Sequence, residues 1–201
     1  MKSAGAGDTR VRLIEAATKL LWERSYHSTS VDDLCAVAGA RKGSLYHFFP
    51  SKVDLAVAAI RWSWEEARRD VFEPVFRSKV SGLSQLQRLA SRTAALQKAA
   101  LEAGGHVLGC PFGSLGQEMA HQDERVREAV QEVFDGHCAY IEAALRRAAD
   151  AGEIEDGDMR QRARAIFALL EGAFLLAKVA NDPRVLKELA SAIPVLAKRS
   201  R

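Results

Sequence analysis

The sequence predicts an all-α protein, with an N-terminal three-helix helix-turn-helix domain and a C-terminal helical domain, and three observations indicate this fold class. No segment alternates apolar and polar side chains for long enough to form a strand, whereas apolar residues recur at helical spacing. Glycine and proline residues separate the helical stretches. The stretches before Pro50 are short and those behind it are longer. We therefore expect two domains, at residues 8–54 and 55–201.

The composition limits the class of protein. With 48% hydrophobic and 27% charged residues, the chain can bury a core and is not disordered. No apolar run reaches the roughly 18 to 20 residues of a membrane span, and the first residues lack a hydrophobic signal segment. Three widely spaced cysteines exclude a disulfide framework and indicate a reducing compartment. We expect a cytoplasmic protein with no membrane partner. Because its net charge is only +3, any nucleic-acid binding must use a local patch.

The first helix is expected from Thr9 to about Arg24, with Asp8 or Thr9 as its N-cap. The preceding stretch, Met1–Gly7, has the composition of a flexible arm. One stripe of this helix is apolar and consists of Leu13, Ile14, Ala17, Leu20 and Leu21.

A second, short helix is predicted to begin at Ser30, because Asp33 three residues later completes a pattern that resembles a capping box. Gly39 ends this helix, as glycine often does at a helix C-terminus. The expected inner face consists of Val31, Leu34, Val37 and Ala38.

Two further helices complete the front part of the chain. A third short helix covers roughly Lys42–Phe48 and is closed by Pro50. The fourth starts at Ser51, its cap, and runs to about Glu73, where Pro74 ends or kinks it.

Behind Pro74 the expected helices are longer. Over the whole chain we expect about nine helices. The first of them stops before Gly104-Gly105 and is marked by Leu83, Leu86, Leu89, Ala90, Thr93 and Leu96. A glycine-interrupted segment from His106 to Gly116 follows, with Cys110-Pro111 at a helix start. Two long helices are predicted over Asp123–Ala151 and Met159–Asn181, and a last one contains Val185, Leu186, Leu189, Ile193 and Leu196.

The second and third helices, joined by Gly39-Ala40-Arg41, have the order of a helix-turn-helix. In such a motif the exposed N-terminal residues of the second helix contact base edges and phosphates in the major groove. The residues expected to face outward there are Arg41, Lys42, Ser44, Tyr46 and His47, while Leu45 and Phe48 or Phe49 face inward. Gly43 allows a phosphate to approach the backbone, and Lys52 at the start of the fourth helix offers a further phosphate site.

Pattern alone leaves open three helices that merely pack with their polar residues in solvent. The order of the residues favours DNA binding, because Thr29–Leu34 and Ala38–Lys52 closely resemble the DNA-binding domain of the TetR (tetracycline repressor) family. The run KGSLYHFFPSK, residues 42–52, carries most of this resemblance, which extends from about Thr9 to Leu55. Two positions depart from the family, since Ser25 replaces a usual glycine and Cys35 a usual alanine or isoleucine.

The resemblance implies a dimeric transcription regulator, usually a repressor, that leaves its double-stranded DNA operator when a small-molecule effector binds the C-terminal domain. By position it places Lys42, Gly43, Ser44, Tyr46 and His47 at the DNA and Lys52 on a phosphate. No cofactor is implied.

The helix over Met159–Asn181 is apolar around nearly its whole circumference in its second half. Such a helix must be buried on more than one side, and a second subunit is the simplest cover. Gly172, Ala173 and Ala177 would let helices approach closely. We therefore expect a homodimer whose seam consists of this helix and the last one, an arrangement that the TetR family also uses. A two-fold dimer presents two reading heads to a palindromic site.

A mostly apolar set of residues in the C-terminal part predicts a hydrophobic or aromatic effector. Taken singly, most of these side chains are core residues, so the prediction concerns the domain. The candidates for effector binding are Trp62, Leu89, Thr93, Leu96, His106, Cys110, Phe112, Leu115, Met119, Phe134, His137, Phe174 and Lys178, with Phe72, Phe76 and Ile141 as further lining.

Cys110 stands out because it precedes proline at a predicted helix start, where the helix N-terminus lowers the pKa of a thiol. The segment GCPFGSLGQE resembles an element of one TetR subgroup, some members of which respond to reactive electrophiles. That resemblance implies a sensor cysteine assisted by Lys178. The alternative is a small buried thiol packed beside a salt-bridged or snorkelling lysine.

Other classes of function find less support. The spacing of His106 and Cys110, with His137-Cys138 further on, does not cluster four zinc ligands, and we predict no metal site. No nucleophile elbow, phosphate loop or zinc-protease motif is present, so we expect no enzyme, and Glu118 and Glu142 are interpreted as solvated or hydrogen-bonded carboxylates. A helical adaptor for protein partners would leave the basic and aromatic run from Arg41 to Lys52 unexplained.

Overall fold

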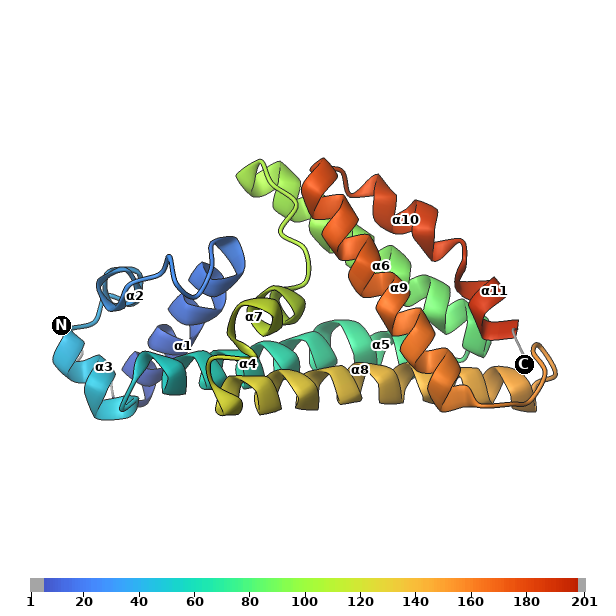
Figure 1. The fold of residues 1–201 in the computed structure, drawn as a ribbon, viewed down its shortest axis with the longest axis horizontal. Coiled ribbons are helices and arrows are strands. Elements are labelled where there is room, and N and C mark those ends of the chain that lie inside the picture. The colour runs from blue at the N-terminus through green and yellow to red at the C-terminus, as the bar shows by residue number, and fades with distance from the viewer. Residues whose placement is uncertain (1–5, 199–201) are drawn as a thin grey trace. The chain divides into compact units, whose positions relative to one another are not determined.

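The computed structural model describes residues 6–198, with side chains from residue 8 onward, and these residues form helices joined by short loops (Figure 1). None of them lies in a strand, so the all-α prediction is confirmed. The chain divides into two compact units. Unit 1 contains residues up to 65 together with 111–133, and unit 2 contains 66–110 together with 134 onward. None of the helices between residues 6 and 198 is long and apolar enough to cross a membrane.

Unit 1 holds the helices α1 (Ala6–Glu23), α2 (Val31–Ala38), α3 (Lys42–Phe48), most of α4 (Lys52–Ala67), α7 (Pro111–Met119) and the first part of α8 (Glu124–Asp150). The predicted cap of α1 is wrong. Asp8 lies inside the first turn, and its carboxylate pairs with Arg12 one turn later at 2.7 Å. The predicted arm falls outside the described residues up to residue 5, and Ala6 and Gly7 already belong to α1.

The ends of α2 confirm the predicted capping box. Ser30 Oγ accepts a hydrogen bond from the backbone N–H of Asp33 at 3.1 Å, and the Asp33 carboxylate accepts one from the Ser30 N–H at 2.9 Å. Gly39 ends the helix with φ of 59°. The predicted inner face is wrong at Val37, which is 51% exposed, whereas Cys35 is buried. An eight-residue helix presents one stripe to the core, and Val37 lies roughly 100° to the side of it.

The core of unit 1 is closed by one leucine from each of its first four helices. These four side chains, Leu13, Leu34, Leu45 and Leu55, are almost completely buried. Phe49 is also buried and Phe48 packs half-buried against the same cluster, as the sequence predicts. The core therefore fixes which face of α3 points outward.

The predicted helix from Ser51 to Glu73 consists of three elements: α4, a π-helical turn η1 (Arg68–Phe72), and α5 (Glu73–Phe76). Ser51 caps α4, since its Oγ accepts the N–H of Asp54 at 3.3 Å. Pro74 has no N–H to donate to the carbonyl of Asp70 four residues earlier. Arg92 Nη2 donates to that carbonyl instead, at 2.6 Å. The proline thus changes the helix type without ending the helical path.

Unit 2 holds η1, α5, α6 (Gly82–Gly104), the rest of α8, α9 (Met159–Ala180), α10 (Arg184–Ala190) and α11 (Ile193–Lys198). The predicted last helix is two helices, because Pro194 has no N–H to donate to the carbonyl of Ala190. When α4–η1–α5 and α10–α11 are each taken as one interrupted helix, the described residues form nine helical segments, as predicted.

The buried core of unit 2 includes the inner stripe of α9, with Ile166, Ala173 and Ala177, and Leu186 of α10. The buried guanidinium of Arg162 donates to the carbonyl of Glu155 at 2.7 Å. It also donates to the carbonyls of Asp156 and Ala197, at 3.2 and 3.1 Å. The C-terminal helix α11 is thereby hydrogen-bonded to the start of α9.

Candidate functional site

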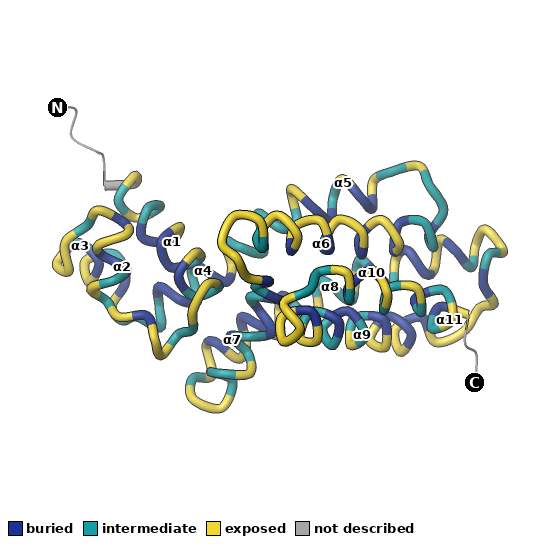
Figure 2. The backbone as a smooth tube through the Cα atoms, turned by 90° about the horizontal axis from the view of Figure 1, so that it is seen from above, coloured by how far each residue is buried: buried dark blue, intermediate teal, exposed yellow. Residues whose placement is uncertain are grey.

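Most of the residues that the sequence predicts at DNA lie on exposed positions of α3, which is largely exposed along its tube (Figure 2). Arg41, Lys42, Tyr46 and His47 are exposed, and Ser44 is half-buried. Gly43 is exposed too, and nothing lies within 4 Å of where its Cβ would be. Because α3 is held by Leu45 and Phe49 underneath, this face is preformed. The structure brings these residues together on one surface, and their contact with DNA stays a prediction.

Two cations lie at the start of α3, in different environments. Lys42 Nζ pairs with the exposed carboxylate of Asp32 at 2.9 Å, and this hydrogen bond raises the pKa of Lys42. Arg41 is the N-cap residue, but its side chain caps nothing. Within residues 8–198 its guanidinium has no ion pair or hydrogen bond. Arg41 is therefore free to bind an external acceptor.

Lys52 is engaged within the protein. Its ammonium donates to the carbonyl of Tyr26 and lies 3.9 Å from the centre of the Tyr26 ring. Partial burial lowers the pKa of Lys52. An ammonium has three N–H groups, so the proposed phosphate contact is compatible with this geometry and remains a prediction.

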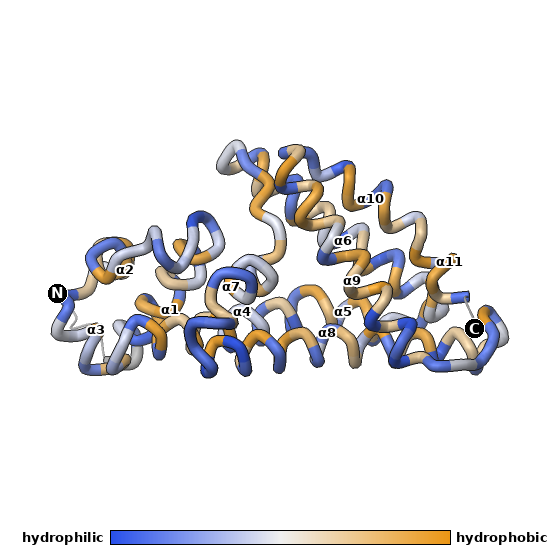
Figure 3. The backbone as a smooth tube through the Cα atoms, viewed as in Figure 1, coloured by the Kyte–Doolittle hydropathy of each residue, from blue (hydrophilic) through white to orange (hydrophobic). Residues whose placement is uncertain are grey.

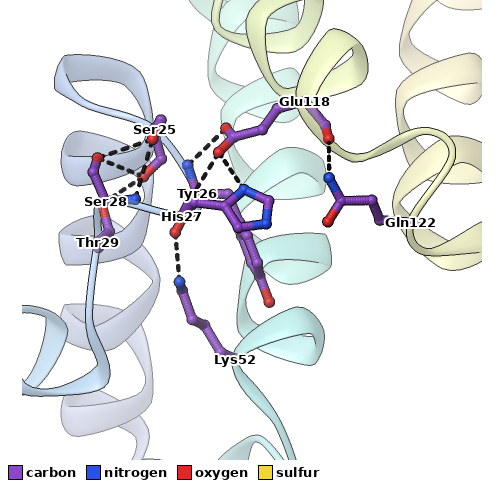
Figure 4. Close-up of polar contacts among 8 residues, drawn as sticks. All are labelled: Ser25, Tyr26, His27, Ser28, Thr29, Lys52, Glu118 and Gln122. Atoms are coloured by element: carbon purple, nitrogen blue, oxygen red, sulfur yellow. Dashed lines mark hydrogen bonds and ion pairs between the residues drawn. The ribbon is translucent and has the colours of Figure 1, made fainter.

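A carboxylate missing from the predicted site residues, that of Glu118 on α7, contacts the loop before α2 (Figure 4). It accepts hydrogen bonds from the backbone N–H groups of Tyr26 and His27, which confirms its interpretation as a hydrogen-bonded residue. Ser25, where the family usually has glycine, does not have a positive φ, since Asn181 is the only non-glycine residue of the described range that does.

The predicted effector residues fall into both units. Trp62, Phe112, Leu115 and Met119 belong to unit 1. Phe112 and Leu115 line a cavity of about 20 Å³ together with residues of α1 and α4. A cavity of that size holds about one water molecule. Met119 is buried and Trp62 packs half-buried against the core of unit 1, so all four residues contribute to the packing of this unit, and their part in effector binding stays a prediction.

Phe134 and His137 of unit 2 take part in an aromatic cluster on η1, α5, α8 and α9. The ring of His137 stacks on Phe167 at 5.4 Å and lies 4.8 Å from Phe72, while Phe134 meets Phe167 edge-on at 4.9 Å. Its further members are Phe76 and Tyr140. Sequence reasoning missed Tyr140 and Phe167 as site residues, although Tyr140 follows His137 at the i, i+3 spacing of one helix face.

Three candidates have exposed side chains. Leu96 is 47% exposed, and His106 and Lys178 are exposed too, so their part in effector binding stays a prediction. Leu96 lies on the outer face of α6, and His106 follows Gly105, where α6 has already ended. The i, i+4 spacing of His106 and Cys110 is consequently not helical. Of the others, Leu89 is buried, and Thr93 is half-buried with its hydroxyl donating to the carbonyl of Ala90 at 3.0 Å.

Cys110 is buried, and its thiol donates a hydrogen bond to Glu171 of α9. Burial raises the pKa of Glu171, and the bond from Cys110 partly opposes this rise. Lys178 lies beside the preceding residue, because a Cβ on Gly109 would come within 3.2 Å of Lys178 Cδ. Sequence reasoning missed Glu171, whose only signal is a carboxylate inside an apolar helix.

The second half of α9 is largely hydrophobic (Figure 3), and part of it is exposed. Leu175, Leu176 and Val179 are 51, 53 and 77% exposed. Phe174, by contrast, packs half-buried against the core of unit 2. Three large apolar side chains on one exposed stripe are what the predicted seam with a second subunit requires.

Comparisons with known proteins agree with this geometry. Residues 13–59 match the family model described as "Bacterial regulatory proteins, tetR family", and residues 82–193 match "Tetracyclin repressor-like, C-terminal domain". The transcriptional regulator AcuR of Cereibacter sphaeroides is 31% identical over 172 residues, covering 85% of this chain and 77% of the relative. The HTH-type transcriptional regulator LmrA of Bacillus subtilis is 27% identical, covering 96% and 98%. A crystal structure of the regulatory protein TetR from Rhodobacter sphaeroides superposes with a TM-score of 0.81 at 27% identity, covering 92% and 97%.

Proposed function

The chain belongs to the TetR family of bacterial transcriptional regulators, and from this premise we propose that it is a cytoplasmic repressor that binds a palindromic operator as a homodimer and is released by a small effector. The observation that carries the proposal is the preformed outer face of α3, with its free Arg41, charged Lys42 and exposed Tyr46. Guanidinium and ammonium groups bind phosphate and guanine edges, and the phenol ring offers an apolar contact to thymine methyl groups.

The exposed stripe of α9 supports the homodimer. Burying Leu175, Leu176 and Val179 against a second copy removes large apolar side chains from water, at about 25 cal/mol per Å². A two-fold axis places the same stripe on both partners, so it is complementary to itself. Two copies of α3 then meet two half-sites of opposite orientation.

The aromatic cluster of unit 2 supports a hydrophobic or aromatic effector. Phe134, His137, Tyr140 and Phe167 are half-buried, so their rings retain surface that a planar ligand can cover. An effector that enters between these rings breaks the contacts that they make with one another. Its own contacts with the rings must be at least as favourable, which favours a ligand that stacks on them as well as they stack on each other.

An electrophilic effector is a second candidate, favoured by Cys110 directly before the start of α7 and by Lys178 beside Gly109. This version expects quinones or hypochlorite to release DNA from the wild type and not from Cys110→Ser. Equal release from both proteins would end the electrophile version and leave the hydrophobic one.

A fluorescence-anisotropy titration with duplexes from the protein's own promoter tests the proposal. We expect saturable binding by a dimer, an affinity that falls steeply with salt, and a specific site preferred over random duplex by at least a thousandfold. Binding that is equal for specific and random duplex, or that is absent at low salt, would contradict it.

A further inference from the structure

The loop between α1 and α2 leads into the helix pair α2 and α3, which we call the reading head. It contains residues 24–30 and leads directly into Ser30, the N-cap of α2. Its backbone N–H groups of Tyr26 and His27 both donate to Glu118 of α7, each at 2.8 Å (Figure 4). His27 Nδ1 lies 2.7 Å from the same carboxylate. One side chain on α7 thus holds two successive peptide groups.

The hydrogen bonds that Glu118 accepts are stronger than those between neutral groups. A carboxylate that accepts from two backbone amides makes charge-assisted hydrogen bonds, and the Glu118 side chain is only 21% exposed. Burial on its own would raise the pKa of Glu118, yet the pKa is lowered, because the two amides and His27 stabilise the ionised form.

Tyr26 is also held from its other side. Its carbonyl accepts from Lys52 in the first turn of α4, and the same ammonium lies over its ring. Within the loop, Thr29 Oγ1 donates to the carbonyl of Ser25 at 2.7 Å, so the segment up to the cap of α2 is internally bonded. The loop therefore cannot move relative to α7 and α4 without breaking these bonds.

We propose that Glu118 is a positioning residue for operator recognition: by holding Tyr26 and His27, it fixes the direction in which α2 and α3 leave the loop, and so sets the specificity of the reading head without belonging to its outer face. The inference rests on the proposed function. It adds a residue 92 positions from Tyr26 to the determinants of operator affinity.

A purely structural role for Glu118 makes a different prediction. If loss of Glu118 only unfolded some molecules, the active fraction would fall equally for operator and for random duplex, and their affinity ratio would stay constant. If Glu118 positions α3, random-duplex binding persists, because it depends on charge, while operator binding falls.

The experiment measures both affinities at one salt concentration for the wild-type dimer, Glu118→Ala and Glu118→Gln. Glu124→Gln is the matched control, because it removes the same charge from unit 1 and, among the residues that the structure describes, Glu124 pairs only with Arg127 on its own helix. We expect the operator-to-random ratio to fall roughly tenfold in Glu118→Ala, about threefold in Glu118→Gln, and not in Glu124→Gln. Amide exchange at Tyr26 and His27 is expected to accelerate in the two Glu118 variants only.

An unchanged ratio in Glu118→Ala overturns the inference, whether or not stability drops. An equal fall of the ratio in Glu124→Gln also overturns it, since charge alone would then account for the effect. If wild-type protein shows no preference for the operator, the proposed function itself has failed, and that outcome is read from the wild type alone.

Discussion

The reading head of unit 1 and the outer face of α9 in unit 2 are both exposed surfaces on well-packed helices, and they have opposite chemistry. The outer face of α3 presents Arg41 and Lys42, and that of α9 presents Leu175, Leu176 and Val179. A charged side chain is well solvated on the protein surface, whereas a stripe of exposed leucine side chains is stabilised when a partner covers it. This difference matches the two roles that we propose, a polyanion on the outer face of α3 and a second copy of the chain on the outer face of α9.

The largest expected effect comes from charging the α9 stripe. Leu175→Glu together with Leu176→Glu places four like charges in the seam of a dimer, so we expect monomers and a roughly thousandfold loss of operator affinity. Sedimentation velocity and anisotropy titration measure the two quantities. The matched control is Leu96→Glu, which charges an exposed leucine on α6 outside the stripe. If the double variant stays dimeric, the stripe is not part of the dimer interface.

A glycine pair compares the packing of the two units. In unit 2, a Cβ on Gly82 would lie 2.0 Å from the carbonyl oxygen of Ala144, so Gly82→Ala should lower the free energy of unfolding by about 3 kcal/mol. In unit 1, Gly43 faces open space, so Gly43→Ala should leave stability equal or up to about 1 kcal/mol higher while it weakens operator binding. Chemical denaturation measures both. Equal stability changes would show that the two sites do not differ in packing.

Substitutions on α3 test the other side of the comparison. Tyr46→Ala and Lys42→Ala are each expected to lower operator affinity about tenfold, with the dimer and melting temperature unchanged, because both side chains are exposed. Lys79→Ala removes an exposed lysine of unit 2 and serves as control. Unchanged operator affinity at fixed salt in both α3 variants would reject the assignment of this face to DNA.

The smallest expected effects concern the pH dependence of stability, and its sign is opposite for Glu118 in unit 1 and Glu171 in unit 2. The lowered pKa of Glu118 means that its stabilisation is present at neutral pH and is lost as the pH falls from 4.5 through the folded-state value. The raised pKa of Glu171 means the reverse, since burial penalises its charged form and stability is lost as the pH rises from 4.5 through the folded-state value.

Glu171→Gln should therefore raise the melting temperature at pH 7 by roughly 2 to 4 °C and lose that advantage in acid, whereas Glu118→Gln should lower the melting temperature at pH 7. Melting curves from pH 4 to 8 check both signs. The same sign of change at pH 7 in the two variants would refute this contrast.

Local signals in the sequence predicted much of the fold. The capping box of Ser30 and Asp33 and the left-handed Gly39 each depend on residues within one turn, so they could be predicted without tertiary information. The outward-facing residues of α3 were also predicted from the local pattern of this one helix. Val37 was misplaced because a short helix has several apolar positions, and only its partner helices decide which of them is covered.

Contacts between distant residues had no such signal. Glu118 and Tyr26 are 92 positions apart, and neither residue type indicates the other. The helix was predicted to end or kink at Pro74, but nothing in the sequence indicated that the distant Arg92 donates to the freed carbonyl of Asp70. Buried Glu171 could be noticed only as a charge in an apolar helix, without its partner Cys110.

Selection of bound duplexes from a random pool by the purified dimer tests the central claim most directly, that α3 is presented twice to the major groove. We predict that the enriched sequences share two inverted half-sites with a constant centre-to-centre spacing near one helical turn of DNA or a multiple of it. Enrichment of a single unrepeated half-site, or of no sequence at all by a dimer that binds DNA, would contradict it.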